Sequence, residues 1–407
     1  MITKYDNYTY ANDDGDNYKK YANLTTEPNR WILEPLGIWP LKRGSIEVSW
    51  KDRCLRRGKS AIFYFLMIFV FVSCAPYVIL EVENIYDKLK LTGPLSFCAM
   101  AILKYIFLTI REEEIQCCIE SIEMDWKKTT HFEDERIMIE KVYSGRRLVT
   151  ICIVFTYGAA SFYYIVLPLM SGKVLAPDMN ITYRPVPFPV ASFLMDIRYS
   201  PTNEIVIFIQ CLYGFAAHSI AAGACSLAAV FTMHACGQLQ VLMNCSLSLN
   251  FFFEEDSHIV LSVKDFFYSF ISLTENLLHE VSLVEVVGCT LNMCLLGYYC
   301  IMEWNKTERL GCLTYGIILT SVTFNIFIFC YIGELLMEQC KILGERSYAI
   351  DWYRLPGKKS QPLILLIAMS RTTTKLTAGN FMELSLSSFS DIIKSSVAYL
   401  NMLRTLT

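Results

Sequence analysis

Six long apolar runs set the strongest limit on how this chain can fold. A helix needs about 20 apolar residues to cross the hydrocarbon core of a bilayer. The runs cover residues 61–80, 91–110, 148–170, 205–233, 281–302 and 310–333. Only 18% of the 407 residues are charged, whereas soluble domains average about 25%. The sequence therefore predicts an all-α, multi-pass membrane protein with six clear spanning helices.

Lysine and arginine are distributed unevenly among the segments that join these runs. Of the 36 Lys and Arg residues, 26 lie before the first run or after runs two, four and six, and seven lie in the alternate segments. Because cytoplasmic segments collect Lys and Arg, the N-terminus is predicted to be cytoplasmic. A seventh span would then place the C-terminus outside the cell.

One further motif agrees with this orientation. Asn180-Ile181-Thr182 is an N-glycosylation acceptor pattern in the segment between runs three and four. That segment is extracellular in the predicted topology, so Asn180 is the expected glycosylation site.

Three stretches indicate helices on the cytoplasmic side of the membrane. Residues 234–249 extend run four, and residues 334–348 extend run six. Residues 262–280 predict an amphipathic helix, whose apolar side chains at helical spacing are Phe266, Phe270, Leu273 and Leu277. One interpretation is a packed cytoplasmic layer, and the other is the ordinary ending of spanning helices.

Motifs for catalysis or metal binding are not found. The run Arg56-Arg57-Gly58-Lys59-Ser60 ends like a phosphate loop, but Arg53 stands where that loop requires glycine. A basic run beside a span is better explained by topology and by contact with lipid headgroups. The five histidines are scattered, and the net charge of −3 gives no case for nucleic acid. We therefore expect no enzyme activity, no catalytic or metal site and no cofactor, with membrane lipid as a partner.

Aromatic and small polar residues collect in the predicted outer halves of the spans. The candidate ligand-binding residues are Phe97, Tyr157, Ser161, Tyr164, Tyr213, His218 and Tyr315. A mostly apolar pocket with a few polar groups suits a small apolar ligand. The alternative is that these residues are interfacial aromatics and helix-packing contacts.

Two charged residues interrupt the apolar runs. Lys104 and Glu285 could pair inside the bundle, because charges within spans tend to face its interior. Alternatively, Lys104 extends to the interface and Glu285 lies near the cytoplasmic end of its helix. Cys300 and Cys312 flank one short loop and could also pair.

The last segment is polar for a membrane helix and long for a linker. Residues 380–406 would span about 40 Å as a helix. A polar stripe runs along it through Glu383, Ser387, Ser390, Lys394, Ala398, Asn401 and Thr405. A helix with such a stripe fits a wet environment shared between subunits, such as a pore. The alternative is a soluble amphipathic tail.

Several stretches resemble the insect odorant receptor family. They are "LEPLGIWP" (33–40), "HACGQLQVL" (234–242), "YAIDWYRLP" (348–356) and residues 364–404, from "ILLIAMS" to "NMLR". The resemblance implies a tuning subunit of an odorant- or pheromone-gated, non-selective cation channel in the plasma membrane of sensory neurons. It further implies a heterotetramer with a co-receptor around a pore lined by the seventh helix, and a small volatile organic ligand in the outer half of the subunit.

The resemblance also divides the chain into four parts. They are a cytoplasmic N-terminal segment (1–60), helices one to six with the outer pocket and the cytoplasmic extensions (61–345), an anchor segment that joins subunits (346–378), and the pore-lining helix (379–407). The short helix of the anchor is expected at 360–370. The hydrophobic gate is expected at Met402 and Leu406, beside Asn401 and Thr405 of the polar stripe.

Two other classes of seven-helix receptor are the alternatives. A G-protein-coupled receptor would have an extracellular N-terminus, Asp-Arg-Tyr after span three and Asn-Pro-x-x-Tyr in span seven. A gustatory-type receptor would carry Thr-Tyr and Gln-Phe in the last span, where this chain has "SSVAYLNMLR".

Overall fold

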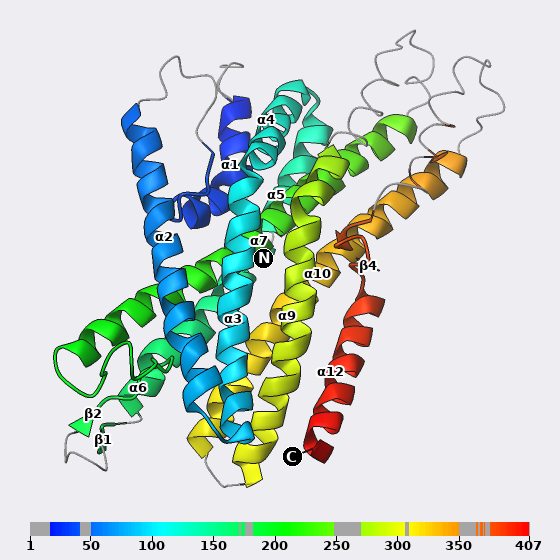
Figure 1. Cartoon of the computed structure of the whole chain (residues 1–407). Helices are drawn as coiled ribbons and strands as arrows, with labels where there is room; N and C mark the ends of the chain where they lie inside the picture. The colour runs from blue at the N-terminus through cyan, green and yellow to red at the C-terminus, as the bar shows by residue number, and fades with distance from the viewer. Residues whose placement is uncertain are drawn as a thin grey trace.

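A computed structural model shows a bundle of long helices (Figure 1). It describes residues 17–40, 50–170, 172–175, 182–247, 270–305, 309–349 and 375–406, together with 364, 367, 368 and 370. The predicted glycosylation site Asn180, residues 262–269 and most of the anchor helix at 360–370 lie outside these described residues.

Each of the six apolar runs lies within one long helical segment. These segments are α2 (Trp50–Pro76) with the π-helical turn η1 (Tyr77–Glu81), α3 (Ile85–Ile110), α5 (Phe132–Ser161) with η2 (Phe162–Val166) and α6 (Leu167–Met170), α7 (Thr202–Leu247), α9 (Ser272–Asn305) and α10 (Arg309–Ala349). All six are long and apolar enough to cross a membrane. The more polar α12 (Leu386–Leu406) supplies the seventh, and the prediction of an all-α membrane protein with seven long helices is confirmed.

Helix α7 forms the centre of the bundle. It contacts α1 (Asn17–Leu33), α2, α3, α5, α9 and α10. Every residue from 220 to 237 is buried, as expected of a core helix that is apolar on all sides. Small residues let neighbouring helices approach closely, and a side chain at Gly223 would overlap Leu33 of α1.

Two helices at the end of the bundle drawn at the top of Figure 1 contain no long apolar run. They are α1 and α4 (Glu112–Lys128). The buried side of α1 is partly polar: Ser226 of α7 donates to Asn29, and the indole of Trp126 in α4 donates to Thr25 over 3.1 Å. Helix α1 therefore packs through hydrogen bonds as well as apolar contacts, and its mean hydropathy gives no sign of burial.

The predicted helical extensions are confirmed, since α7 continues to Leu247 and α10 to Ala349. Both extensions lie toward the upper end in Figure 1. Of the apolar positions predicted before span five, Phe270 and Leu277 are buried. Cys300 and Cys312 are free thiols whose sulfur atoms lie 3.7 Å apart.

The expected helix over 380–406 is wrong at its beginning. Strands β3 (Thr377–Ala378) and β4 (Met382–Glu383) form an antiparallel hairpin, and α12 begins only at Leu386. Gly379 and Asn380 both have positive φ, as a tight hairpin turn requires and a helix forbids. The 21 residues of α12 still span about 32 Å. A second hairpin, β1 (Val174–Leu175) with β2 (Thr182–Tyr183), lies toward the lower end of the bundle in Figure 1, opposite α1 and α4.

Candidate functional site

An aromatic cluster fills the half of the bundle nearer to the β1–β2 hairpin. We define it as Phe97, Tyr163, Tyr164, Phe188, Tyr213 and His218. The ring of His218 lies between Phe97 (centroids 4.9 Å apart) and Tyr164 (5.9 Å). Phe188 packs edge-on against Tyr213 at 5.5 Å. Helices α3 and α7, the turn η2 and the loop before α7 thus each bring at least one ring to the same place.

Two local features bring Tyr164 into the cluster. The turn η2 is π-helical, and such turns commonly occur at functional sites. The Tyr164 ring then lies directly on Gly214 of α7, where any added Cβ would overlap it. The position of this ring therefore depends on the absence of a side chain at residue 214.

Hydrogen bonds fix two other members of the cluster. The Gln210 side chain holds the backbone of Phe188 on both sides, accepting from its N–H over 3.0 Å and donating to its carbonyl over 2.8 Å. The Nδ1 atom of His218 lies 2.8 Å from the Gly214 carbonyl oxygen. Because a carbonyl can only accept, the neutral imidazole carries its proton on Nδ1, which leaves Nε2 as an acceptor.

The seven candidate ligand-binding residues do not all meet. Phe97, Tyr164, Tyr213 and His218 belong to the aromatic cluster. The Tyr157 hydroxyl instead bonds to Ser219 over 2.6 Å. Tyr315 belongs to a second group of rings, with Tyr299, Tyr298 and Tyr86. Ser161 is half-buried at the end of α5, and within the described part of the chain no hydrogen bond joins it to the cluster.

Sequence reasoning missed Tyr163 and Phe188. Phe188 lies in a Pro-rich segment between spans, where hydropathy indicates an exposed loop. The available signal was Gln210, because a polar side chain inside an apolar run must find a partner. Its partner is the backbone of this loop.

Lys104 and Glu285 form a buried ion pair between α3 and α9. Their side chains are only 3% and 1% exposed, so the pairing alternative is confirmed over extension of Lys104 to the interface. Glu285 also accepts from Asn325 of α10 and from Cys289. Three spanning helices are thus joined through one carboxylate.

Helix α12 touches the rest of the chain along one narrow face. Ile392 and Ser396 are buried, and this face packs against α9 and α10. The predicted polar stripe is exposed at Ser387, Ser390, Lys394, Ala398, Asn401 and Thr405. Met402 is also 60% exposed, while the Leu406 side chain lies outside the described atoms. Glu383 does not belong to the stripe, since it lies in β4 and pairs with Lys375.

Comparison with known families identifies this architecture. The family model described as 7tm Odorant receptor matches residues 84–397. This range includes every residue of the aromatic cluster, the β3–β4 hairpin and most of α12. The chain belongs to this family. It is therefore a multi-pass membrane protein of the odorant receptors, and the G-protein-coupled and gustatory-type alternatives are not favoured.

Individual odorant receptors are similar to it over different lengths. Odorant receptor 13a of Drosophila melanogaster is 21% identical, covering 91% of this chain and 92% of its own length. Odorant receptor 47a of the same species is 27% identical over 28% of this chain and 31% of its own length.

Solved structures of an odorant receptor share the fold. The olfactory receptor OR5 of Machilis hrabei in complex with eugenol matches with a TM-score of 0.79 at 13% identity, covering 96% of this chain and all of that chain. The structure of the same receptor described without eugenol gives a TM-score of 0.77 at 14% identity, with the same coverage.

Proposed function

We propose that this odorant receptor is a tuning subunit of an odorant- or pheromone-gated, non-selective cation channel. In this proposal it binds a small volatile organic ligand at the aromatic cluster. The observation that carries the proposal is the cluster itself, which gathers apolar rings and one imidazole acceptor around Tyr164 on a π-helical turn. Sites for small apolar ligands combine many apolar groups with a few polar ones in this way.

The chemistry of the cluster favours a compact, largely apolar ligand. Phe97 and Tyr164 offer ring faces and edges on which an aromatic or alkyl group can pack. Nε2 of His218 can accept a hydrogen bond from a ligand hydroxyl. In the proposal Tyr213 lies beside Phe188 at the edge of the site. Tyr157, Ser161 and Tyr315, on α5 and α10, lie around the cluster rather than in it.

Helix α12 is the proposed pore helix. Only one narrow face of α12 is covered, so its polar stripe is free to face neighbouring subunits. This arrangement suits a pore shared in a heterotetramer with a co-receptor. We propose Met402 and Leu406 as the hydrophobic gate, with Asn401 and Thr405 beside it. The extended ends of α7 and α10, with residues 346–378, form the proposed anchor between subunits.

Gating would follow from a shift between closed and open populations. A ligand can open the pore only if it binds the open state better than the closed one. A ligand seated among Phe97, Tyr164 and His218 would change how α3, α5 and α7 pack, and α12 would respond through its contacts with α9 and α10.

The test is expression with and without a co-receptor in a cell that lacks other odorant receptors. We expect volatile-evoked cation current within milliseconds, without added nucleotide, only when both subunits are present. His218→Phe should selectively weaken responses to volatiles that carry a hydroxyl, while Phe208→Leu, a change at an exposed aromatic of α7, should respond as wild type does. Responses that require a nucleotide or a G protein would contradict the channel proposal.

A further inference from the structure

The β3–β4 hairpin lies against α9 and α10 and leads directly into α12 (Figure 1). Leu376, Ala378 and Leu384 are all buried. The Gly379 N–H donates to the His279 carbonyl of α9 over 2.9 Å. On the other side, a side chain at Gly333 of α10 would overlap the Leu384 backbone. Any displacement of the hairpin is therefore passed to the first turn of α12.

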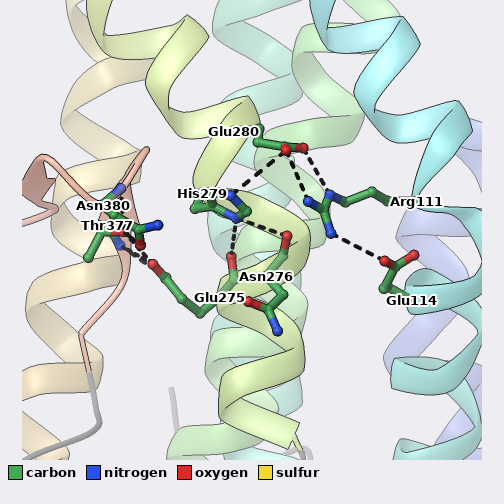
Figure 2. Close-up of polar contacts among 8 residues, drawn as sticks. All are labelled: Arg111, Glu114, Glu275, Asn276, His279, Glu280, Thr377 and Asn380. Atoms are coloured by element: carbon green, nitrogen blue, oxygen red, sulfur yellow. Dashed lines mark hydrogen bonds and ion pairs between the residues drawn. The ribbon is translucent and has the colours of Figure 1, made fainter.

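Beside the Gly379–His279 backbone hydrogen bond, one carboxylate of α9 makes several hydrogen bonds to the hairpin. Both oxygens of Glu275 accept from the Thr377 backbone N–H, at 3.1 and 3.0 Å, and Glu275 also accepts from the Thr377 hydroxyl (Figure 2). The Thr377 hydroxyl oxygen accepts in turn from the Asn380 N–H over 3.2 Å. Hydrogen bonds to an ionised acceptor are roughly twice as strong as those between neutral groups. Glu275 thus fixes both the position and the internal turn of the hairpin.

The neighbouring turn of α9 is tied to the end of α3. Arg111, between α3 and α4, forms two hydrogen bonds with Glu280: Nε to Oε2 over 2.9 Å and Nη2 to Oε1 over 3.0 Å. Its Nη1 atom donates to Glu114 over 3.2 Å. Figure 2 shows Glu275 directed toward the hairpin and Glu280 toward Arg111, from opposite sides of the same stretch of α9. A bidentate pair of this kind fixes the orientation of the two side chains as well as the distance between them.

These contacts join the candidate ligand site to the candidate pore helix. Helix α3 carries Phe97 and ends at Ile110, directly before Arg111. We propose that Glu275 and Arg111 are positioning residues for gating, which make the end of α3, the foot of α9 and the β3–β4 hairpin move as one unit. A displacement of α3 by ligand then reaches α12 through Arg111–Glu280 and Glu275–Thr377. This proposal rests on the proposed channel function.

Thr377→Val is the sharpest test, because it removes the hydroxyl and preserves the shape of the side chain. The receptor is expressed with a co-receptor, and three quantities are measured: surface protein by labelling, basal current and ligand-evoked current. We expect wild-type surface protein, and a half-maximal ligand concentration raised by about fivefold or more, the lower range of typical allosteric coupling. Thr377→Ser keeps the hydroxyl and should restore the wild-type response.

Two further sets of variants distinguish a role in coupling ligand binding to pore opening from a role in structural stability alone. Glu275→Gln should shift the response in the same direction, and the Glu275→Gln/Thr377→Val pair should shift it less than the product of the two single shifts, because both remove one interaction. Arg111→Gln should also raise the half-maximal concentration, with partial rescue in Arg111→Lys. Asn276→Gln, an exposed change on the same turn of α9, is the matched control and should behave as wild type.

The outcomes distinguish the two proposals. If the wild-type receptor conducts and the Thr377→Val and Glu275→Gln variants gate as it does, the positioning role is overturned and the channel function stands. The same conclusion follows from loss of surface protein in both variants when the remaining channels gate normally, since that result assigns only a structural role. A wild-type receptor that gives no ligand-evoked current with a co-receptor would overturn the channel function and this inference together.

Discussion

Tyr164 can lie across α7 because residue 214 has no side chain. Gly214→Ala should push the ring out of the cluster or force the helices apart, since a Cβ there would overlap the tyrosine. Forced overpacking of this kind costs about 1–3 kcal/mol. We expect a lower thermal unfolding midpoint for the purified receptor and weaker responses to volatiles.

The matched control for that change is Gly158→Ala in α5. Apart from its chain neighbours and the adjacent backbone of its own helix, no atom lies within 4 Å of a Cβ added at residue 158, so stability and responses should stay at wild-type level. Equal behaviour of Gly214→Ala and Gly158→Ala would show that the packing of Tyr164 on α7 is unimportant.

The Lys104–Glu285 pair is sensitive to the loss of either partner. Lys104→Met should destabilise the fold by about 3–5 kcal/mol, because it leaves a buried carboxylate without its cation. The double variant Lys104→Met/Glu285→Gln should regain most of that loss, since the amide can still accept from Asn325. Thermal unfolding of the purified receptor measures both effects.

Lys394→Met serves as the control for Lys104→Met. Lys394 is an exposed lysine of α12 whose only described ion pair is with nearby Asp391, and its loss should leave stability unchanged. A Lys104→Met receptor as stable as wild type would mean that the buried pair contributes nothing to the fold.

Individual residues were predictable from the sequence only where their chemistry is unusual for a span. Lys104, Glu285 and His218 stood out because polar groups inside apolar runs must be satisfied by a partner. The sequence raised the pairing of Lys104 with Glu285 as one alternative, but only the packing of α3 on α9 decides between pairing and extension of Lys104 to the interface. Phe188 itself gave no signal, because a phenylalanine in a loop is ordinary; only Gln210, the polar residue of α7 that holds its backbone, pointed to a buried partner.

At the scale of elements, α12 differs from the other long helices in how little of it is covered. Cysteines placed at Ser390 and Asn401 should react rapidly with a water-soluble thiol reagent, because both positions are exposed. A cysteine at Ser396 should be protected by α9, since Ser396 is 5% exposed and its hydroxyl lies 3.4 Å from the Thr290 carbonyl oxygen of α9. The measurement is ligand-evoked current before and after the reagent, compared with wild type carrying its native cysteines.

The three cysteine positions give three distinguishable outcomes. Block of current at Ser390 and Asn401 but not at Ser396 would support a pore beside the polar stripe. Equal reactivity at all three positions would contradict the described packing of α12. No effect at any of them would argue that ions pass elsewhere.

The elements that are long and apolar were predictable, and the others were not. Six helices follow from the need for about 20 apolar residues in a span. The helix α1 has a mixed buried face and is recognised only once Trp126 and Ser226 meet it. The hairpin before α12 was missed because a stripe at 3–4 spacing continues in the sequence through Glu383, although the left-handed turn at Gly379 and Asn380 prevents a helix there.

For the whole molecule, the distribution of Lys and Arg predicts one orientation in the membrane. An epitope tag at the N-terminus should be detected only after cells are permeabilised, and a tag after Thr407 should be detected on intact cells. Asn180→Gln should increase mobility on a gel, as removal of a glycan does, while Asn7→Gln should not. A C-terminal tag hidden in intact cells would contradict this orientation.

The two ends of the bundle are built differently. The end with α1 and α4 is fastened by polar side-chain pairs, among them the salt bridge of Arg146 with Glu27 at 2.8 Å and the hydrogen bond between His234 and Asp125 at 3.0 Å. Glu27 lies in α1, outside the spans, and its hydrogen bond from Arg146 lowers the pKa of that carboxyl. The other end holds the aromatic cluster, whose rings meet edge-on or tilted. A receptor made in this way can vary the residues of the candidate ligand site without disturbing the end that holds its helices together.

The buried ion pair also has a consequence for how the chain is made. Lys104 is synthesised 181 residues before Glu285, which at 5–20 residues per second is roughly 10 to 35 s of translation. The cost of an unpaired lysine reaches about 2.5–3.5 kcal/mol at the centre of a membrane helix, and Lys104 lies six residues before the end of α3. During this interval α3 needs water or the insertion machinery beside it, and it can settle into the bundle only when α9 arrives. The order of synthesis thus makes the fifth span, rather than the second, the step at which this receptor commits to its fold.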